Sequence, residues 1–180
     1  MPKVHDVPPE PWRSFLADLD LALPEPVELH CCGGFVAIHV YGIARTTSDL
    51  DYLALIPNDR HKELLELAGR DSVLHKRHRV HLHAVTVAAY PEDYERRLLP
   101  LFPDAWEKIK LLALEAHDLA LSKLERNFER DRDDIMRLAR AGPIDAGTLT
   151  TRYRAELRPY LTRTSWHDKT LQMWIESYWS

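Results

Sequence analysis

The order of apolar and polar residues predicts a small sheet flanked by helices in the first two thirds of the chain. Apolar residues recur at helical spacing across 9–23, and two prolines follow at once. Shorter apolar runs bounded by Gly or Pro are typical of strands. We expect strands at 27–32, 50–56, 80–87 and 109–114, with further helices at 35–41, 60–68 and 91–99.

The pattern changes to helical periodicity in the last third. Apolar residues recur every three or four positions across 117–128 and 130–140, and Gly142-Pro143 interrupts this run. Two more helices are expected at 146–161 and 169–179. The predicted fold class is therefore α/β (α+β), a small mixed sheet flanked by helices and followed by an all-helical C-terminal part. We expect a core domain over 1–115 and a helical extension over 116–180 packed on it.

A glycine pair and a pair of aspartates are the candidate chemistry. Gly33-Gly34 lies between the first expected strand and the helix after it, where a close approach of the backbone to phosphate is feasible. The alternative is a tight strand-to-helix turn with no ligand. Asp49 and Asp51 stand at i and i+2 in an expected strand, so both point to one face. Aspartate is disfavoured in strands, which favours a metal site over a solvated strand start.

The loop before the aspartates carries two further candidates. Arg45 could bind phosphate oxygens in a bidentate manner, or be a solvated loop residue. Ser48 could contact a nucleotide, or be a turn residue. Paired carboxylates suit Mg²⁺ (or Mn²⁺) bound to a nucleoside triphosphate (NTP).

Composition narrows the class of protein. The 180 residues are 45% hydrophobic, enough for a packed core, and carry a formal charge of −4. A surface that coats nucleic acid broadly is therefore not expected. No segment approaches the ~18 apolar residues of a membrane span, and residues 1–12 lack the apolar run of a signal peptide. We expect a cytoplasmic protein without a membrane partner.

The glycine pair followed by Asp-x-Asp resembles the nucleotidyltransferase superfamily of polymerase-beta-like proteins. A second segment is similar to the helical part of AbiEii-type abortive-infection toxins and their small uncharacterised relatives. The two segments come in that group's order, and the resemblance covers roughly residues 27–140. The matching positions in the helical part are Asp118, Leu119, Lys123, Leu124, Arg126, Arg130, Asp131 and Asp134.

The resemblance implies roles for residues in the helical part. It implies that Lys123 contacts the nucleotide phosphates and that Asp131 supports the catalytic site. The residues alone favour another interpretation, a solvated basic face with salt bridges from Lys123 to Asp131 and Asp134. Asp118 is most simply a helix N-cap.

The resemblance also implies an activity, the Mg-dependent transfer of a nucleoside monophosphate from an NTP to an acceptor. The acceptor would be an RNA (tRNA), a protein or a small molecule, and the protein would be the toxin of a toxin–antitoxin or phage-defence pair with a cognate antitoxin. Many such enzymes add a third carboxylate from a later strand, whereas His81 and His83 occupy that face here. A carboxylate from the helical part could serve, the enzyme could work with two, or the protein could be an inactive nucleotide- or partner-binding module.

Overall fold

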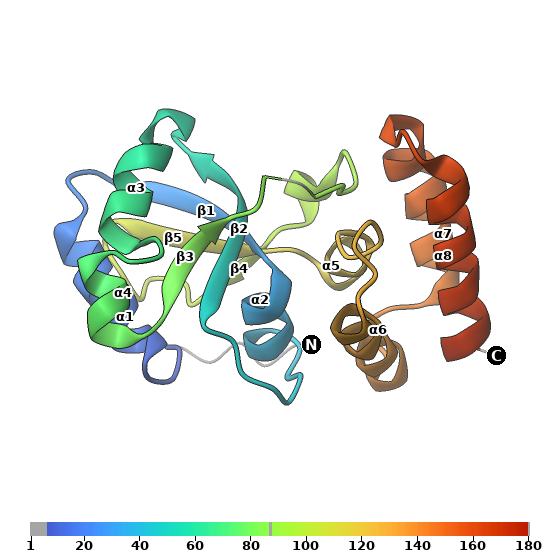
Figure 1. Cartoon of the computed structure of the whole chain (residues 1–180), viewed down its shortest axis with the longest axis horizontal. Coiled ribbons are helices and arrows are strands. Elements are labelled where there is room, and N and C mark those ends of the chain that lie inside the picture. Colours follow the sequence, from blue (N-terminus) through green and yellow to red (C-terminus); the bar gives the residue numbers. More distant parts are fainter. Residues whose placement is uncertain (1–6, 87, 180) are drawn as a thin grey trace. The chain divides into compact units, whose positions relative to one another are not determined.

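The computed structural model describes residues 7–86 and 88–179, which form two compact units (Figure 1). The first unit comprises 7–86 together with 98–113, and the second comprises 88–97 together with 114–179. Residues 1–6 lie outside the described residues, and so does this part of the N-terminal segment 1–12, which was expected to lack a signal peptide. No helix of the described chain is long and apolar enough to cross a membrane.

The first unit is built on a five-stranded mixed sheet with the order β3-β2-β1-β5-β4. β1 pairs antiparallel with β2 and parallel with β5, β2 pairs parallel with β3, and β4 pairs antiparallel with β5. The five strands are β1 Val27–Cys32, β2 Asp49–Ile56, β3 His81–Ala84, β4 Leu99–Leu101 and β5 Ile109–Ala113. The helices are α1 Trp12–Ala22, α2 Gly33–His39, α3 His61–Ala68 and α4 Val73–His78, with a 3₁₀ turn at Asn58–Arg60.

Helices α1, α3 and α4 contact one another and form the core with one face of this sheet (Figure 1). Phe15 and Leu16 of α1 are fully buried, as are Leu50 and Tyr52 of β2. The Tyr52 hydroxyl lies 3.2 Å from Nδ1 of His61 in α3, which assigns this face of β2 to the helical layer. Because side chains alternate along a strand, Asp49 and Asp51 project from the opposite face.

The second unit is helical. It contains a 3₁₀ turn at Tyr94–Arg97 and the helices α5 Ala116–Leu121, α6 Glu129–Ala141, α7 Ala146–Arg152 and α8 Thr164–Tyr178. A π-helical turn at Tyr153–Leu157 and a 3₁₀ turn at Arg158–Tyr160 follow α7. The mixed sheet followed by these helices confirms the predicted fold class.

Several predicted elements have other bounds. The helix expected at 117–128 ends at Leu121, and a turn precedes α6. The segment between the expected helix at 60–68 and the expected strand at 80–87 contains α4, whose N-cap Ser72 accepts a hydrogen bond from the His75 N–H. The strand expected at 80–87 shortens to β3, with Val87 outside the described residues, and the helix expected at 91–99 becomes a 3₁₀ turn followed by β4. The helix expected at 146–161 is α-helical as far as Arg152 and continues through the π-helical turn at Tyr153–Leu157 and the 3₁₀ turn at Arg158–Tyr160.

Candidate active site

Four polar side chains share the face of the sheet that is opposite the helical layer. In the parallel pairing of β2 and β3, Asp49 lies across from His81 and Asp51 across from His83. Leu50, between the two aspartates, and Leu82, between the two histidines, are buried on the other face. Strand register therefore brings two carboxylates and two imidazoles together.

Asp51 lies between β3 and the turn that begins α2. Its Oδ1 is 2.8 Å from Nδ1 of His83. On its other side, a Cβ atom built on Gly33 would lie 2.1 Å from Asp51 Oδ2, and Gly33 has a φ of +66°. Only glycine meets both requirements, because it accepts a positive φ and leaves room for the carboxylate.

Asp49 is held from its own loop and from β3. The Ser48 hydroxyl donates to Asp49 Oδ1 over 2.9 Å, and Nε2 of His81 lies 3.6 Å from the same oxygen. The His81 side chain is only 4% exposed, and its ring contacts that of His75 in a tilted arrangement with a centroid distance of 4.8 Å. Burial lowers the pKa of His81, against the opposing effect of the Asp49 charge. Among the described residues, His81 Nδ1 has no hydrogen-bond partner.

Arg45 lies over the second glycine of the pair. A Cβ atom built on Gly34 would lie 2.7 Å and 2.8 Å from the two terminal guanidinium nitrogens. The glycine pair therefore accommodates Asp51 at one position and Arg45 at the next. Gly33, Gly34, Arg45, Ser48, Asp49 and Asp51, all predicted from sequence, are gathered within the first unit.

The donor set fits a divalent cation that also binds phosphate. Within residues 7–86 and 88–179, no three His, Cys, Asp or Glu side chains form a ready-made metal site. Mg²⁺ does not require one, because it usually binds one or two carboxylates and takes its other ligands from water and substrate phosphates. Asp49 and Asp51, with exposed side-chain fractions of 39% and 23%, are accessible to such an ion.

Lys123 and Asp131, the remaining predicted site residues, form a buried ionic cluster in the second unit. The Lys123 ammonium is 2.9 Å from Asp134 Oδ2 and 3.4 Å from Asp131 Oδ1, and its side chain is 4% exposed. Arg126 also binds Asp131 through two hydrogen bonds, one of them 2.7 Å long. The salt bridges of the alternative interpretation are thus present, but the lysine is buried rather than solvated.

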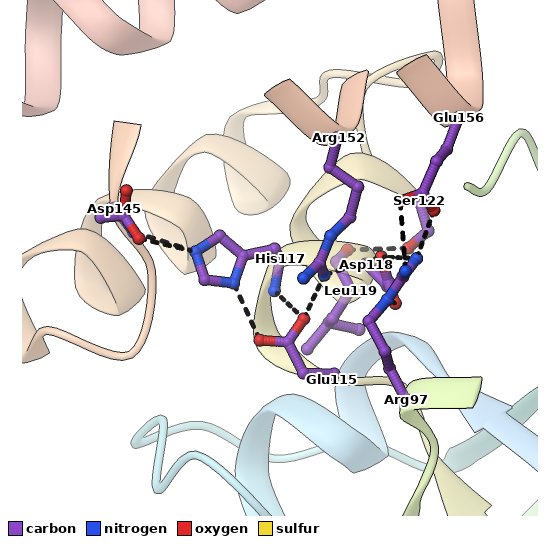
Figure 2. Close-up of polar contacts among 9 residues, drawn as sticks. All are labelled: Arg97, Glu115, His117, Asp118, Leu119, Ser122, Asp145, Arg152 and Glu156. Atoms are coloured by element: carbon purple, nitrogen blue, oxygen red, sulfur yellow. Dashed lines mark hydrogen bonds and ion pairs between the residues drawn. The ribbon is translucent and has the colours of Figure 1, made fainter. Parts of the chain in front are cut away.

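A second buried network fixes α5, shown in Figure 2. Arg97 donates to Asp118 over 2.8 Å and to Glu156 over 2.6 Å, and Arg152 donates to Asp118 over 2.9 Å. The interpretation of Asp118 as an N-cap is wrong, because Glu115 is the N-cap of α5 and Asp118 is completely buried inside the helix.

Glu115 is the second acidic centre of this network. It accepts hydrogen bonds from Nδ1 of His117 over 2.8 Å and from Arg152. Burial opposes ionisation of Glu115, but these hydrogen bonds and charges prevail and lower its pKa to about 2. Because the acidic groups are bonded to arginine or histidine within the second unit, we assign this network a structural role.

His81 and His83 were seen in the sequence as the residues that replace a third carboxylate, but not as partners of the aspartates. The alternation of His81-Leu82-His83 indicated a shared face. Only the register between β2 and β3 shows that this face is that of Asp49 and Asp51.

A mixed sheet with a glycine turn beside two carboxylates is the arrangement expected of a nucleotidyltransferase. The model of a family described as "Nucleotidyltransferase of unknown function (DUF6036)" matches residues 24–178. The chain belongs to this family, which supports membership of the nucleotidyltransferase superfamily and does not single out the AbiEii-type toxins. No curated protein and no solved structure matches the chain.

Proposed function

We propose that the protein transfers a nucleoside monophosphate from an NTP to a hydroxyl-bearing acceptor. The observation that carries this proposal is the grouping of Asp49 and Asp51 on one sheet face, with the Asp51 carboxylate against Gly33. In this reaction the acceptor oxygen bonds to the α-phosphorus, the bond from that phosphorus to the β-phosphate oxygen breaks, and pyrophosphate leaves. The acceptor proton passes to solvent.

Different residues of the first unit would bind the metal ion and the phosphate groups. Asp49 and Asp51 would hold Mg²⁺ (or Mn²⁺), which when bound neutralises the charge that develops on the phosphates. Gly33 and Gly34 leave room beside the α2 turn for the Asp51 carboxylate and the Arg45 guanidinium, and the backbone of this turn would bind the phosphate chain. Arg45, whose guanidinium lies over Gly34, adds a planar donor suited to phosphate oxygens.

The roles of Lys123 and Asp131 are a separate part of the proposal. A nucleotide-binding Lys123 would have to exchange its bonds to Asp131 and Asp134 for phosphate oxygens. NTP affinities of Lys123→Ala and Lys123→Arg, each with circular dichroism to verify folding, test this role. Weaker NTP binding by a folded alanine variant supports it, and unchanged affinity assigns Lys123 to the stability of the second unit.

The decisive test of the activity is a matched pair of variants. Asp51→Asn removes a carboxylate of the site, whereas Asp18→Asn removes a carboxylate on α1 that binds His78 instead. Each protein is incubated with each of four labelled NTPs, Mg²⁺ or Mn²⁺, and total tRNA, lysate protein or small metabolites. Pyrophosphate release with labelled acceptor is expected for the parent and Asp18→Asn but not for Asp51→Asn. Equal activity in Asp51→Asn would refute the mechanism.

The same variants test the proposed biological role as a toxin. We expect induced expression of the parent protein to arrest bacterial growth and Asp51→Asn to leave growth normal. Co-expression with a neighbouring gene that restores growth would identify the cognate antitoxin. Growth arrest by both proteins would show that the toxicity does not depend on nucleotidyl transfer.

A further inference from the structure

We infer that His83 is a cation ligand beside Asp51, so that the site prefers a transition-metal ion such as Mn²⁺ to Mg²⁺. The inference rests on the proposed function, because it concerns the cation that would accompany the triphosphate. It assigns a role to the side chain that occupies the place of a third carboxylate.

The separation of the donor atoms supports this inference. Asp51 Oδ1 and His83 Nδ1 are 2.8 Å apart. Two adjacent donors on an octahedral ion, each at about 2.1 Å, would be about 3.0 Å apart. An ion can therefore bind both atoms if the two side chains move apart by a few tenths of an ångström, and it would replace the proton of the hydrogen bond between them.

Exposure distinguishes His83 from its neighbour. The His83 side chain is 59% exposed, whereas His81 is 4% exposed and its ring contacts that of His75. An ion arriving with a phosphate chain can reach His83 without rearrangement of the sheet. The Nε2 atom of His81 lies 3.6 Å from Asp49 Oδ1, but the burial of this side chain keeps it from an arriving ion.

The chemistry of the donor then determines the cation. Mg²⁺ is a hard ion that takes oxygen ligands, whereas imidazole nitrogen suits first-row transition metals. Two carboxylates and one imidazole carry one negative charge fewer than three carboxylates, which also weakens Mg²⁺ relative to ions that gain from nitrogen. Because the three side chains form no ready-made cage, we expect binding to require phosphate oxygens.

The test uses Mn²⁺ with inorganic tripolyphosphate, a ligand that contains no nitrogen. Pulsed electron paramagnetic resonance of the bound Mn²⁺ detects a directly coordinated imidazole through its ¹⁴N modulation, and ¹⁵N-histidine labelling verifies the assignment. His83→Ala should lose this signal and bind Mn²⁺ at least about tenfold more weakly. His83→Asp should lose the signal and bind Mg²⁺ more tightly than the parent.

A matched control is provided by His78, which is also 2.8 Å from a carboxylate, that of Asp18 on α1, and which lies away from the sheet face that carries Asp49 and Asp51. His78→Ala should keep the ¹⁴N signal and the Mn²⁺ affinity. Mn²⁺ that binds through Asp51 without any ¹⁴N signal would overturn the inference and leave the proposed function standing. A parent protein that binds no Mn²⁺ or Mg²⁺ with tripolyphosphate would refute the inference together with the metal site of the proposed function.

Discussion

Substitution of Gly33 by alanine should disable the site far more than it destabilises the fold. The added Cβ would lie 2.1 Å from Asp51 Oδ2 and 2.9 Å from both Cβ and Cγ of Asp51. Ordinary contacts between carbon atoms are about 3.5–4.0 Å. Because the Asp51 Cβ atom is itself too close, rotation of the carboxylate alone cannot relieve the clash. The α2 turn or β2 must shift, and the carboxylate retreats by roughly 1 Å.

The magnitudes separate this effect from simple backbone strain. Gly33 has a φ of +66°, and alanine in this region costs about 1–2 kcal/mol. Gly42 has a φ of +68° and nothing within 4 Å of a built Cβ atom. Gly42→Ala therefore has the same backbone strain as Gly33→Ala but no steric clash. A displacement of about 1 Å at a catalytic group costs on the order of 10²-fold in rate.

The assay compares the two alanine variants directly. Urea unfolding should show a loss of about 1–2 kcal/mol for Gly42→Ala and at least as much for Gly33→Ala. Mn²⁺ affinity with tripolyphosphate and the rate of pyrophosphate release should fall only in Gly33→Ala. A Gly33→Ala protein with the metal affinity and rate of Gly42→Ala would refute the close approach of Asp51 to this turn as a requirement of the site.

Three further predictions concern the second unit. Because the pKa of Glu115 is lowered to about 2, its ionic contribution to stability should be complete above pH ~5 and lost as the pH falls toward 2. The difference in unfolding free energy between the parent and Glu115→Gln, measured from pH 6 to pH 2, should therefore shrink, and a constant difference would contradict the assignment. Lys123→Ala should lower the free energy of unfolding by about 3–5 kcal/mol, because it removes the ammonium group from the buried Asp134 carboxylate and leaves Asp131 with Arg126 as its cation. Asp118→Ala should cost about 1.5–3 kcal/mol in urea unfolding, because it removes the buried carboxylate that Arg97 and Arg152 share while each arginine keeps its other acidic partner. A loss below about 1 kcal/mol would show that the network is solvated.

Local sequence patterns determined much of the first unit. The apolar run 27–32 coincides with β1 because a short buried strand between proline and glycine has few alternatives. The i, i+2 spacing placed Asp49 and Asp51 on one face, since side-chain alternation is a property of any strand. The glycine pair was recognisable as a turn after β1, and Gly33 is required there because its positive φ and the adjacent carboxylate exclude a side chain.

Tertiary contacts decided where elements end and which distant residues meet. Helical periodicity continued past Leu121, but the chain leaves the helix there, with Asn127 at a φ of 46° and its side chain accepting a hydrogen bond from Trp174 of α8. That turn also brings Lys123 to the carboxylates of α6. Likewise, His83 meets Asp51 only because β2 and β3, which α3 and α4 connect along the chain, pair in parallel. Periodicity reports the environment of each residue along its own segment, whereas the pairing of segments depends on packing between them. The sequence alone therefore placed Asp49 and Asp51 on one strand face, and only the tertiary structure showed that His81 and His83 lie beside them.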